Sequence, residues 1–173
     1  PECLLRTVGN GLEAYARLAV PDGAGTPGAR NSRAVANAGP AIFDVAHAPV
    51  VPRANEAVVV TARVTDPDGV DTVSLRYRID PNTTTTTIPM RDDGSNGDAV
   101  VGDGIYSARM PGRAAGSQVA FTVTASDRDP SPASSVFPAP LVFPAASVQE
   151  ALVRWGETKP FGNLGVYRLW QRQ

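Results

Sequence analysis

The residues whose types best fit a chemical site lie together in the segment RDDGSNGDAVVGDGIY, residues 91–106. Carboxylate and amide oxygens are the ligands that Ca²⁺ takes, and the glycines allow the backbone to fold these oxygens inward. When Asp92 is counted as position one of a twelve-residue calcium loop, Asn96, Asp98 and Asp103 fall at positions five, seven and twelve. The segment therefore predicts a candidate calcium site at these four residues.

The same segment also fits a purely structural turn. Gly94 stands at position three, where a calcium loop carries a ligating side chain, and the carboxylate at position twelve is the shorter Asp rather than Glu. Asp and Asn side chains accept hydrogen bonds from nearby backbone amides in tight turns, and Gly supplies positive φ. Both interpretations stay open here. A second acidic segment, residues 65–71, contains the Pro-Asp-Gly signature of a turn and is interpreted as one.

Other catalytic chemistry finds little support in the sequence. His47 is the single histidine and lies in an expected edge strand, and Cys3 is the single cysteine, which excludes an intrachain disulfide and a multi-cysteine zinc site. The chain contains no phosphate-binding loop, dinucleotide fingerprint, nucleophile elbow or metalloprotease helix motif. We therefore expect no catalytic residues, no organic cofactor and no enzyme activity.

Alternating hydrophobicity predicts the strands that would position the acidic loop. In residues 72–79, Val73, Leu75, Tyr77 and Ile79 share one face, and polar side chains occupy the other. The same period of two recurs in two further segments, with the apolar face formed by Val58, Val60, Ala62 and Val64 in one and by Val119, Phe121, Val123 and Ala125 in the other.

Weaker strand candidates are residues 42–48, 86–90, 105–110 and 136–143. The last contains Pro138 and Pro140, which suit an edge strand because proline donates no backbone hydrogen bond. Gly and Pro each occur 16 times, as expected for short strands joined by tight turns. The pattern predicts an all-β fold, an antiparallel β-sandwich of about seven strands.

Four segments are expected along the chain. Residues 1–20 form short flanking strands, 21–40 a Gly/Pro-rich linker, 41–145 the sandwich and 146–173 a C-terminal segment. In the last segment, Val148, Leu152 and Trp155 have helix-like spacing. The first residue is Pro1, so we interpret the chain as a piece of a longer protein.

The charge balance and hydropathy narrow the set of partners. Sixteen Lys and Arg against 17 Asp and Glu give a formal net charge of -1, which does not favour a nucleic-acid partner. No continuous apolar run has the length of a membrane span, so no membrane insertion is expected.

The core resembles the Ig-like or fibronectin-III-like modules of large exported bacterial proteins. The resemblance covers roughly residues 40–143 and is carried by VVVTARVTDPDGVDTVSLRYRID, MRDDGSNGDAVVGDGIYSARMPG and AGSQVAFTVTASD, in that order. TPGARNS at residues 26–32 resembles the end of a bacterial lamin-tail domain. EALVRWGETKPFGNLGVYRLW at residues 150–170 resembles the entry to a CotH-type spore-coat kinase domain, whose ATP- and metal-binding residues have no counterpart here.

The resemblance implies a secreted or cell-surface bacterial protein in which this chain is a non-catalytic structural or interaction module, a spacer or adaptor. Its expected partners are neighbouring domains of the same polypeptide and a surface protein or polysaccharide. Two alternatives remain. A carbohydrate-binding sandwich would need exposed aromatic side chains, whereas Tyr77 and Phe121 are expected to point inward and aromatics make up only 6% of the chain. A metal-dependent hydrolase would use the acidic loop.

Overall fold

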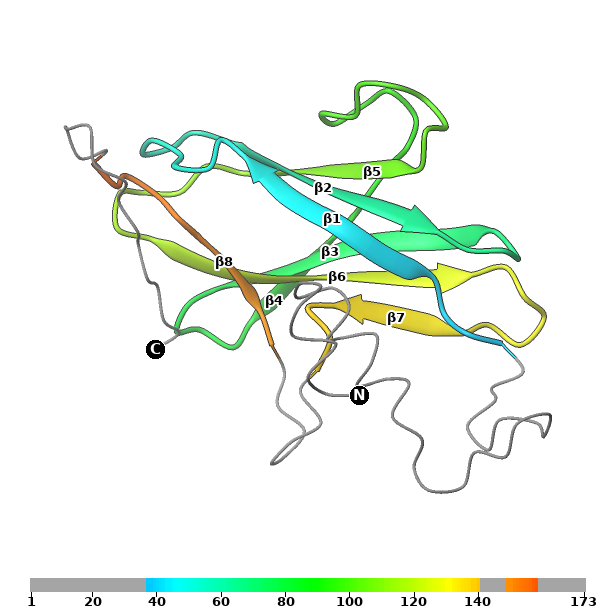
Figure 1. Cartoon of the computed structure of the whole chain (residues 1–173). Coiled ribbons are helices and arrows are strands. Elements are labelled where there is room, and N and C mark those ends of the chain that lie inside the picture. Colours follow the sequence, from blue (N-terminus) through cyan, green and yellow to red (C-terminus); the bar gives the residue numbers. More distant parts are fainter. Residues whose placement is uncertain (1–36, 141–148, 159–173) are drawn as a thin grey trace, which may run out of the picture. The chain divides into compact units, whose positions relative to one another are not determined.

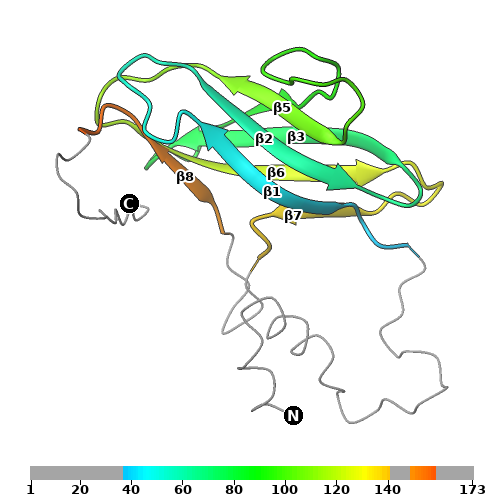
Figure 2. The ribbon, with the colours of Figure 1, turned by 45° about the horizontal axis from the view of Figure 1, so that its top comes forward.

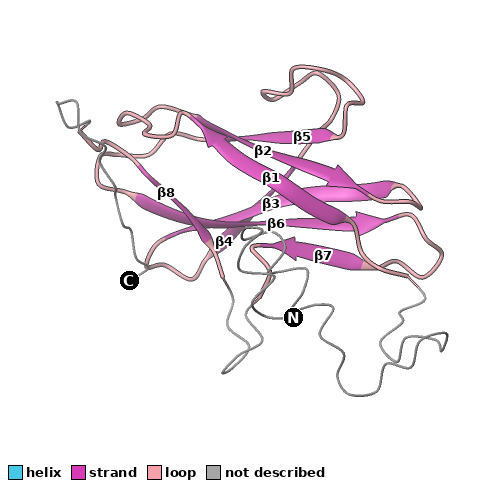
Figure 3. Ribbon diagram, in the orientation of Figure 1, coloured by secondary structure: helices cyan, strands magenta, loops and turns pink. Residues whose placement is uncertain are grey.

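The fold is an antiparallel β-sandwich. The structure, a computed structural model, describes residues 37–140 and 149–158, and within these ranges it contains strands and no helix (Figures 1 and 3). No helix of the described residues could cross a membrane. The strands are β1 (Ala41–Ala48), β2 (Val58–Thr65), β3 (Val70–Ile79), β4 (Thr85–Pro89), β5 (Ile105–Met110), β6 (Gln118–Asp127), β7 (Ser134–Phe137) and β8 (Ala151–Arg154).

The strands form two sheets in which all pairs are antiparallel. One sheet has the order β1-β2-β5, and the other has the order β4-β3-β6-β7, with β8 also paired to β6 (Figure 1). β3 runs along one edge of β6 over its whole length. The opposite edge is shared, because β8 pairs with residues 118–121 and β7 with residues 123–126 (Figure 2).

The core lies between the two sheets and uses the apolar faces predicted by the alternation. Along β2, every second side chain from Val58 to Val64 is buried, and Tyr77 and Phe121 lie opposite each other on neighbouring strands of the second sheet. Burial of these faces removes apolar surface from water, which is the main force holding the two sheets together. The predicted all-β sandwich is therefore confirmed, and β1 is an edge strand as expected for the segment containing His47.

The C-terminal segment differs from the expectation. The helix-like interpretation of Val148, Leu152 and Trp155 is wrong where the structure describes it, because residues 151–154 form the strand β8. Val153 and Trp155 alternate with less buried neighbours and have no exposed surface. β8 pairs with the part of the β6 edge that β7 does not reach, and this pairing outweighs the local spacing.

The strand predicted at residues 136–143 begins and ends earlier, as β7. Pro138 follows its last residue and has no backbone N–H to continue the ladder. The expectations for residues 1–36, which include Cys3, the flanking strands and most of the linker, lie outside the described residues, as do residues 141–148 and 159–173.

Candidate functional site

The acidic segment forms the connection between β4 and β5. Its base is closed by Arg91 and Ser107, whose backbone N–H groups each donate to the other residue's carbonyl at 2.8 Å. Between these residues the chain makes a long excursion and returns to the sheet at Ile105. The carboxylates of the loop therefore lie close to the edge of the β1-β2-β5 sheet.

Asp92 organises the returning half of the loop. One carboxylate oxygen accepts hydrogen bonds from the backbone N–H groups of Gly102 at 2.6 Å and Asp103 at 3.2 Å, and the other accepts one from Gly104 at 2.9 Å. Gly102 and Gly104 have φ of 73° and 80°, a conformation that glycine adopts without strain. One half-buried side chain thus satisfies three consecutive amides.

Asp98 and Asp103 organise shorter stretches of the same loop. The Asp98 carboxylate accepts hydrogen bonds from Gly94 N–H at 2.6 Å and Val100 N–H at 3.3 Å, and Asp103 accepts one from Ile105 N–H at 2.8 Å. These contacts are the side-chain-to-backbone bonds expected of Asp in turns. All three carboxylates are therefore engaged in holding the loop's backbone.

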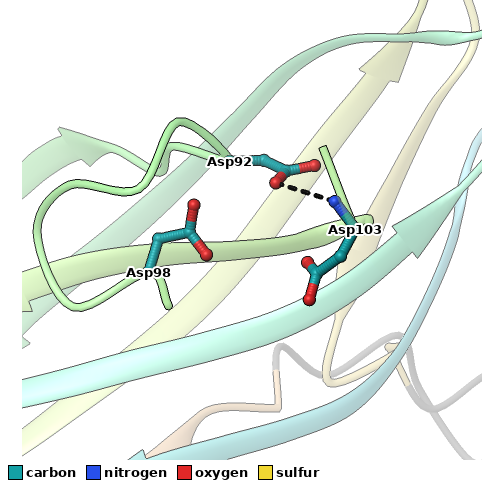
Figure 4. A group of neighbouring side chains, drawn as sticks. All are labelled: Asp92, Asp98 and Asp103. Atoms are coloured by element: carbon teal, nitrogen blue, oxygen red, sulfur yellow. Dashed lines mark hydrogen bonds between the residues drawn. The ribbon is translucent and has the colours of Figure 1, made fainter. Parts of the chain in front are cut away.

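The loop also brings these three carboxylates together. Asp92, Asp98 and Asp103 each place an oxygen within 4.8 Å of the others. Figure 4 shows the three neighbouring side chains. Two like charges about 4 Å apart in water repel by about 1 kcal/mol, so a bound divalent cation would relieve a real repulsion. A calcium ion takes 6–8 oxygens, and the three carboxylates would supply part of that shell.

Asn96, the fourth predicted ligand, occupies the turn of the loop in the left-handed conformation, with φ of 56°. Its side-chain Nδ2 donates to Ser95 Oγ at 3.0 Å. Asn tolerates this region better than most residues do. Asn96 therefore has a structural role in the turn. Its role as a calcium ligand stays a prediction.

The surroundings of this loop shift the pKa values of two residues, Asp93 and Tyr106. The pKa of Asp93 lies below its ordinary value, chiefly because the Ser95 hydroxyl donates to its carboxylate. Tyr106, the first strand residue after Ile105, has a pKa above its ordinary value, because burial and then the nearby charge of Asp92 disfavour the phenolate. The lowered pKa of Asp93 favours the carboxylate form, which accepts the hydrogen bonds from Ser95.

The remaining sequence candidates have structural contacts. In the turn between β2 and β3, Asp66 accepts hydrogen bonds from Asp68 N–H through its side chain and from Gly69 N–H through its carbonyl, as predicted for Pro-Asp-Gly. His47 is half-buried on β1, with Nδ1 3.2 Å from the carbonyl oxygen of Pro49. Neither residue belongs to a cluster of metal-ligating side chains within the described ranges.

A second charged region, around Arg78 and Arg113 beside β4, was missed by the sequence analysis. Arg78 ion-pairs with Asp80 and Glu150, each at 2.7 Å. Arg78 and Arg113 both line a cavity of about 250 Å³ next to Thr84 and Thr86. In the alternating pattern of its strand, Arg78 is predicted to face solvent. Its partner Glu150 lies 72 positions away, so no local pattern could have identified the cluster.

Comparison with known proteins adds no assignment. The sequence matches no protein-family model, and no curated protein matches it.

Proposed function

We propose that this chain is a non-catalytic β-sandwich module of a secreted or cell-surface bacterial protein, which acts as a spacer or adaptor between neighbouring parts of the polypeptide. The observation that carries the proposal is that the described chain enters the sandwich at one end of β6 and leaves it at the other. A module with this path separates whatever precedes it from whatever follows it.

The entry is fixed at the end of β6. Asn37 Nδ2 donates to the carboxylate of Asp127, the last residue of β6, at 2.8 Å and to Ser131 O at 3.1 Å. Asp127 is buried and also accepts hydrogen bonds from the backbone N–H groups of Asp129 and Ala133. Any side chain at Gly39 would collide with the Ser134 backbone, which would lie 2.6 Å from its Cβ. These contacts define where the chain joins the sandwich.

The exit is fixed at the beginning of β6. Trp155 donates its backbone N–H to Ser117 O at 3.0 Å and accepts from Gly116 N–H at 2.8 Å, while its indole N–H donates to Glu56 O at 2.7 Å. The indole has no exposed surface. Ser117 and Asp127 are separated by the length of β6, which at about 3.3 Å per residue is roughly 30 Å.

The strand order supports the Ig-like or fibronectin-III-like character of the proposed module. The three-stranded sheet β1-β2-β5 faces a sheet of order β4-β3-β6-β7, and sandwiches of these classes distribute about seven strands over two sheets in a comparable way.

The hydrogen bonds of the acidic loop also support a structural role over the hydrolase alternative. The inward positions of Tyr77 and Phe121 weigh against an aromatic carbohydrate platform on that face.

A distance measurement tests the spacer role. Cys3 is replaced by Ser, and spin labels are attached at Ala38→Cys and Thr158→Cys, both exposed positions at the two ends of the described module. We expect one narrow distance distribution centred at roughly 30–40 Å. A broad distribution, or one centred below about 20 Å, would contradict a spacer with fixed ends.

Calcium binding at the acidic loop is a second proposed role, favoured by the convergence of the Asp92, Asp98 and Asp103 carboxylates. A cation that binds only the folded chain raises its apparent stability. We therefore expect thermal unfolding of the unmodified chain to shift upward in millimolar Ca²⁺ relative to chelator. Asp103→Asn should abolish the shift, whereas Asp68→Asn, which removes an exposed charge elsewhere, should retain it. Overlapping melts of the unmodified chain would restrict the three residues to a turn role.

A further inference from the structure

The outer edge of β4 has the features of a docking site for an extended peptide. Among the described residues, β4 is the terminal strand of its sheet and pairs with β3 alone. Thr83 and Thr84 precede it, and the side chains from Thr83 to Thr87 are exposed. The residues from Thr83 to Ile88 carry no charge, and the one edge-protecting residue within β4 is the proline at its last position, Pro89. The stretch before Pro89 is therefore the part of this edge that can pair with a partner strand. The exposed β-branched residues favour an extended partner strand.

Cavities lie on both faces of this edge. Thr84 and Thr86 line the cavity of about 250 Å³ that is also lined by Tyr77 and Arg113, which we call the inner cavity. Thr83 and Thr85 line a second cavity of about 300 Å³ that contains Arg76. Successive residues of a strand point to opposite faces, so the two cavities flank β4 on its two sides. A strand added to β4 would place its side chains alternately over one cavity and the other.

Arg113 gives the inner cavity a positive charge that no described carboxylate neutralises. Its guanidinium lies 5.8 Å from the centre of the Tyr77 ring, and Nη2 is 3.4 Å from the Tyr77 hydroxyl, a long contact. Its Nε–H is buried and has no acceptor. A partly buried guanidinium without a counter-ion favours a partner that supplies one.

The position of Arg113 is fixed by the backbone. Its carbonyl accepts a hydrogen bond from Asn55 N–H at 2.7 Å. The preceding Gly112 packs so closely on Asn55 that a Cβ would lie 2.2 Å from that backbone. The guanidinium is thus presented at the cavity on a segment that cannot easily move, which reduces the entropy lost on binding. On the outer face, Arg76 is exposed and forms no ion pair with the described residues.

We propose that the edge of β4 binds an extended acidic peptide segment of a partner protein, which adds to the sheet as a further strand and places a carboxylate against Arg113. Backbone hydrogen bonds to β4 supply affinity, and the arginines on the two faces select acidic side chains. This role is separate from the spacer role, because the outer edge of β4 takes no part in the entry contacts of Asn37 or the exit contacts of Trp155.

The test is a titration of the isotope-labelled full chain, followed by backbone amide chemical shifts, with a short peptide that alternates glutamate and valine. We expect saturable shifts that include Thr84 to Ile88 and Arg113. A lysine-valine peptide of the same length should not bind. A glutamate peptide with prolines in place of the valines should not bind either, because it cannot donate to the ladder.

Variants of Arg113 separate the site from general electrostatic attraction. Arg113→Gln should weaken binding about tenfold, the effect of losing one charge-assisted hydrogen bond, and Arg113→Lys should restore part of the loss. Arg109→Gln is the matched control, because it removes an exposed arginine from β5 and should leave the affinity unchanged. An unperturbed amide spectrum of each variant before titration confirms folding.

Several results would overturn the proposal. These are the absence of saturable shifts, equal binding of the proline peptide, or an affinity unaffected by Arg113→Gln. Binding of digalacturonate in place of the peptide would assign the Arg113 cavity to an acidic sugar. Shifts at β4 that depend on protein concentration alone would assign the edge to a second copy of the chain. A failed peptide titration would leave the label-to-label distance across the module unaffected, so the two proposals can fail separately.

Discussion

Arg78 and Arg113 line the same cavity, but among the described residues Arg78 is paired with carboxylates and Arg113 is not. Arg78 forms ion pairs with Asp80 and Glu150, and its pKa is raised above the usual range, chiefly by the hydrogen bond to Glu150. Among the described side chains, the Arg113 guanidinium forms its hydrogen bond and its cation–π contact with Tyr77 and has no carboxylate partner. The first arginine joins β3 to the segment that leads into β8, while the charge of the second stays available.

In the acidic loop, as at Arg78, the charged groups are engaged within the fold. Its three clustered carboxylates accept six hydrogen bonds from backbone amides, so their charges are used to hold the fold. The comparison separates charges that build the module from a charge that can recognise a partner. Substitutions that remove each kind of charge should therefore differ in their effect on stability.

The largest effect is expected for Arg78→Gln. The substitution leaves the carboxylates of Asp80 and Glu150, whose side chains are only 1% and 13% exposed, without their arginine. Breaking a buried ion pair costs about 3 kcal/mol or more. Urea denaturation should show this loss in the free energy of unfolding. A loss below about 1 kcal/mol would mean that the pair contributes no more than a surface ion pair.

Asp92→Ala is expected to have the next largest effect. It removes the acceptor for three backbone amides, and at about 1 kcal/mol for each such bond, with some replaced by water, the loss should be about 2 kcal/mol. Asp92→Asn keeps one acceptor oxygen and should lose less. Denaturation of both variants checks the order, and an equal stability of Asp92→Ala and the unmodified chain would show that the loop does not depend on this residue.

Arg113→Gln should change the free energy of unfolding by less than about 1 kcal/mol. The variant loses a cation–π contact worth about 0.5–1 kcal/mol, but it also removes a buried N–H without an acceptor. The same urea titration that measures Arg78→Gln provides the comparison. A loss as large as that of Arg78→Gln would show that the Arg113 charge is also part of the fold.

The smallest effect is expected at low pH, where protonation of Asp93 removes its contribution to the free energy of unfolding. The folded-state pKa of Asp93 is lowered, so its contribution is present above the unfolded pKa of about 3.9 and is lost as pH falls through the folded value. Ser95→Ala removes the donor hydroxyl, and the pKa of Asp93 should rise toward its ordinary value. Titration of the Asp93 carboxyl carbon by NMR measures the shift. An unchanged pKa would assign the lowering to the backbone amide of Ser95 and to Arg91 instead.

The local parts of the fold could be predicted from the sequence. In β2, apolar and polar residues alternate, and the alternation itself marks the buried face. In β6 the predicted apolar face is buried, but Gln118, Ala120 and Thr122 on the opposite face are buried as well. The Asp92–Asp103 loop was also identifiable, because its Asp and Gly residues specify their own backbone contacts. That its three carboxylates lie together follows from the same local bonds.

The missed features depend on contacts between distant parts of the chain. β8 is a strand because half of the β6 edge is free to pair with it, which the spacing of Leu152 and Trp155 could not reveal. Arg113 lies in a loop after β5 and looks like any exposed cation until Tyr77 and β4 are placed beside it. Partners set by topology leave no periodic signal in the sequence.

The difference between the two arginines is tested most directly by thermal unfolding with and without the glutamate-valine peptide. A ligand that binds only the folded state raises the unfolding midpoint, and the rise grows with the logarithm of the ligand concentration divided by Kd. The account predicts a clear rise for the unmodified chain and for Arg109→Gln, and a much smaller one for Arg113→Gln. An equal rise in Arg113→Gln, or no rise in the unmodified chain, would contradict the assignment of the Arg113 charge to a partner.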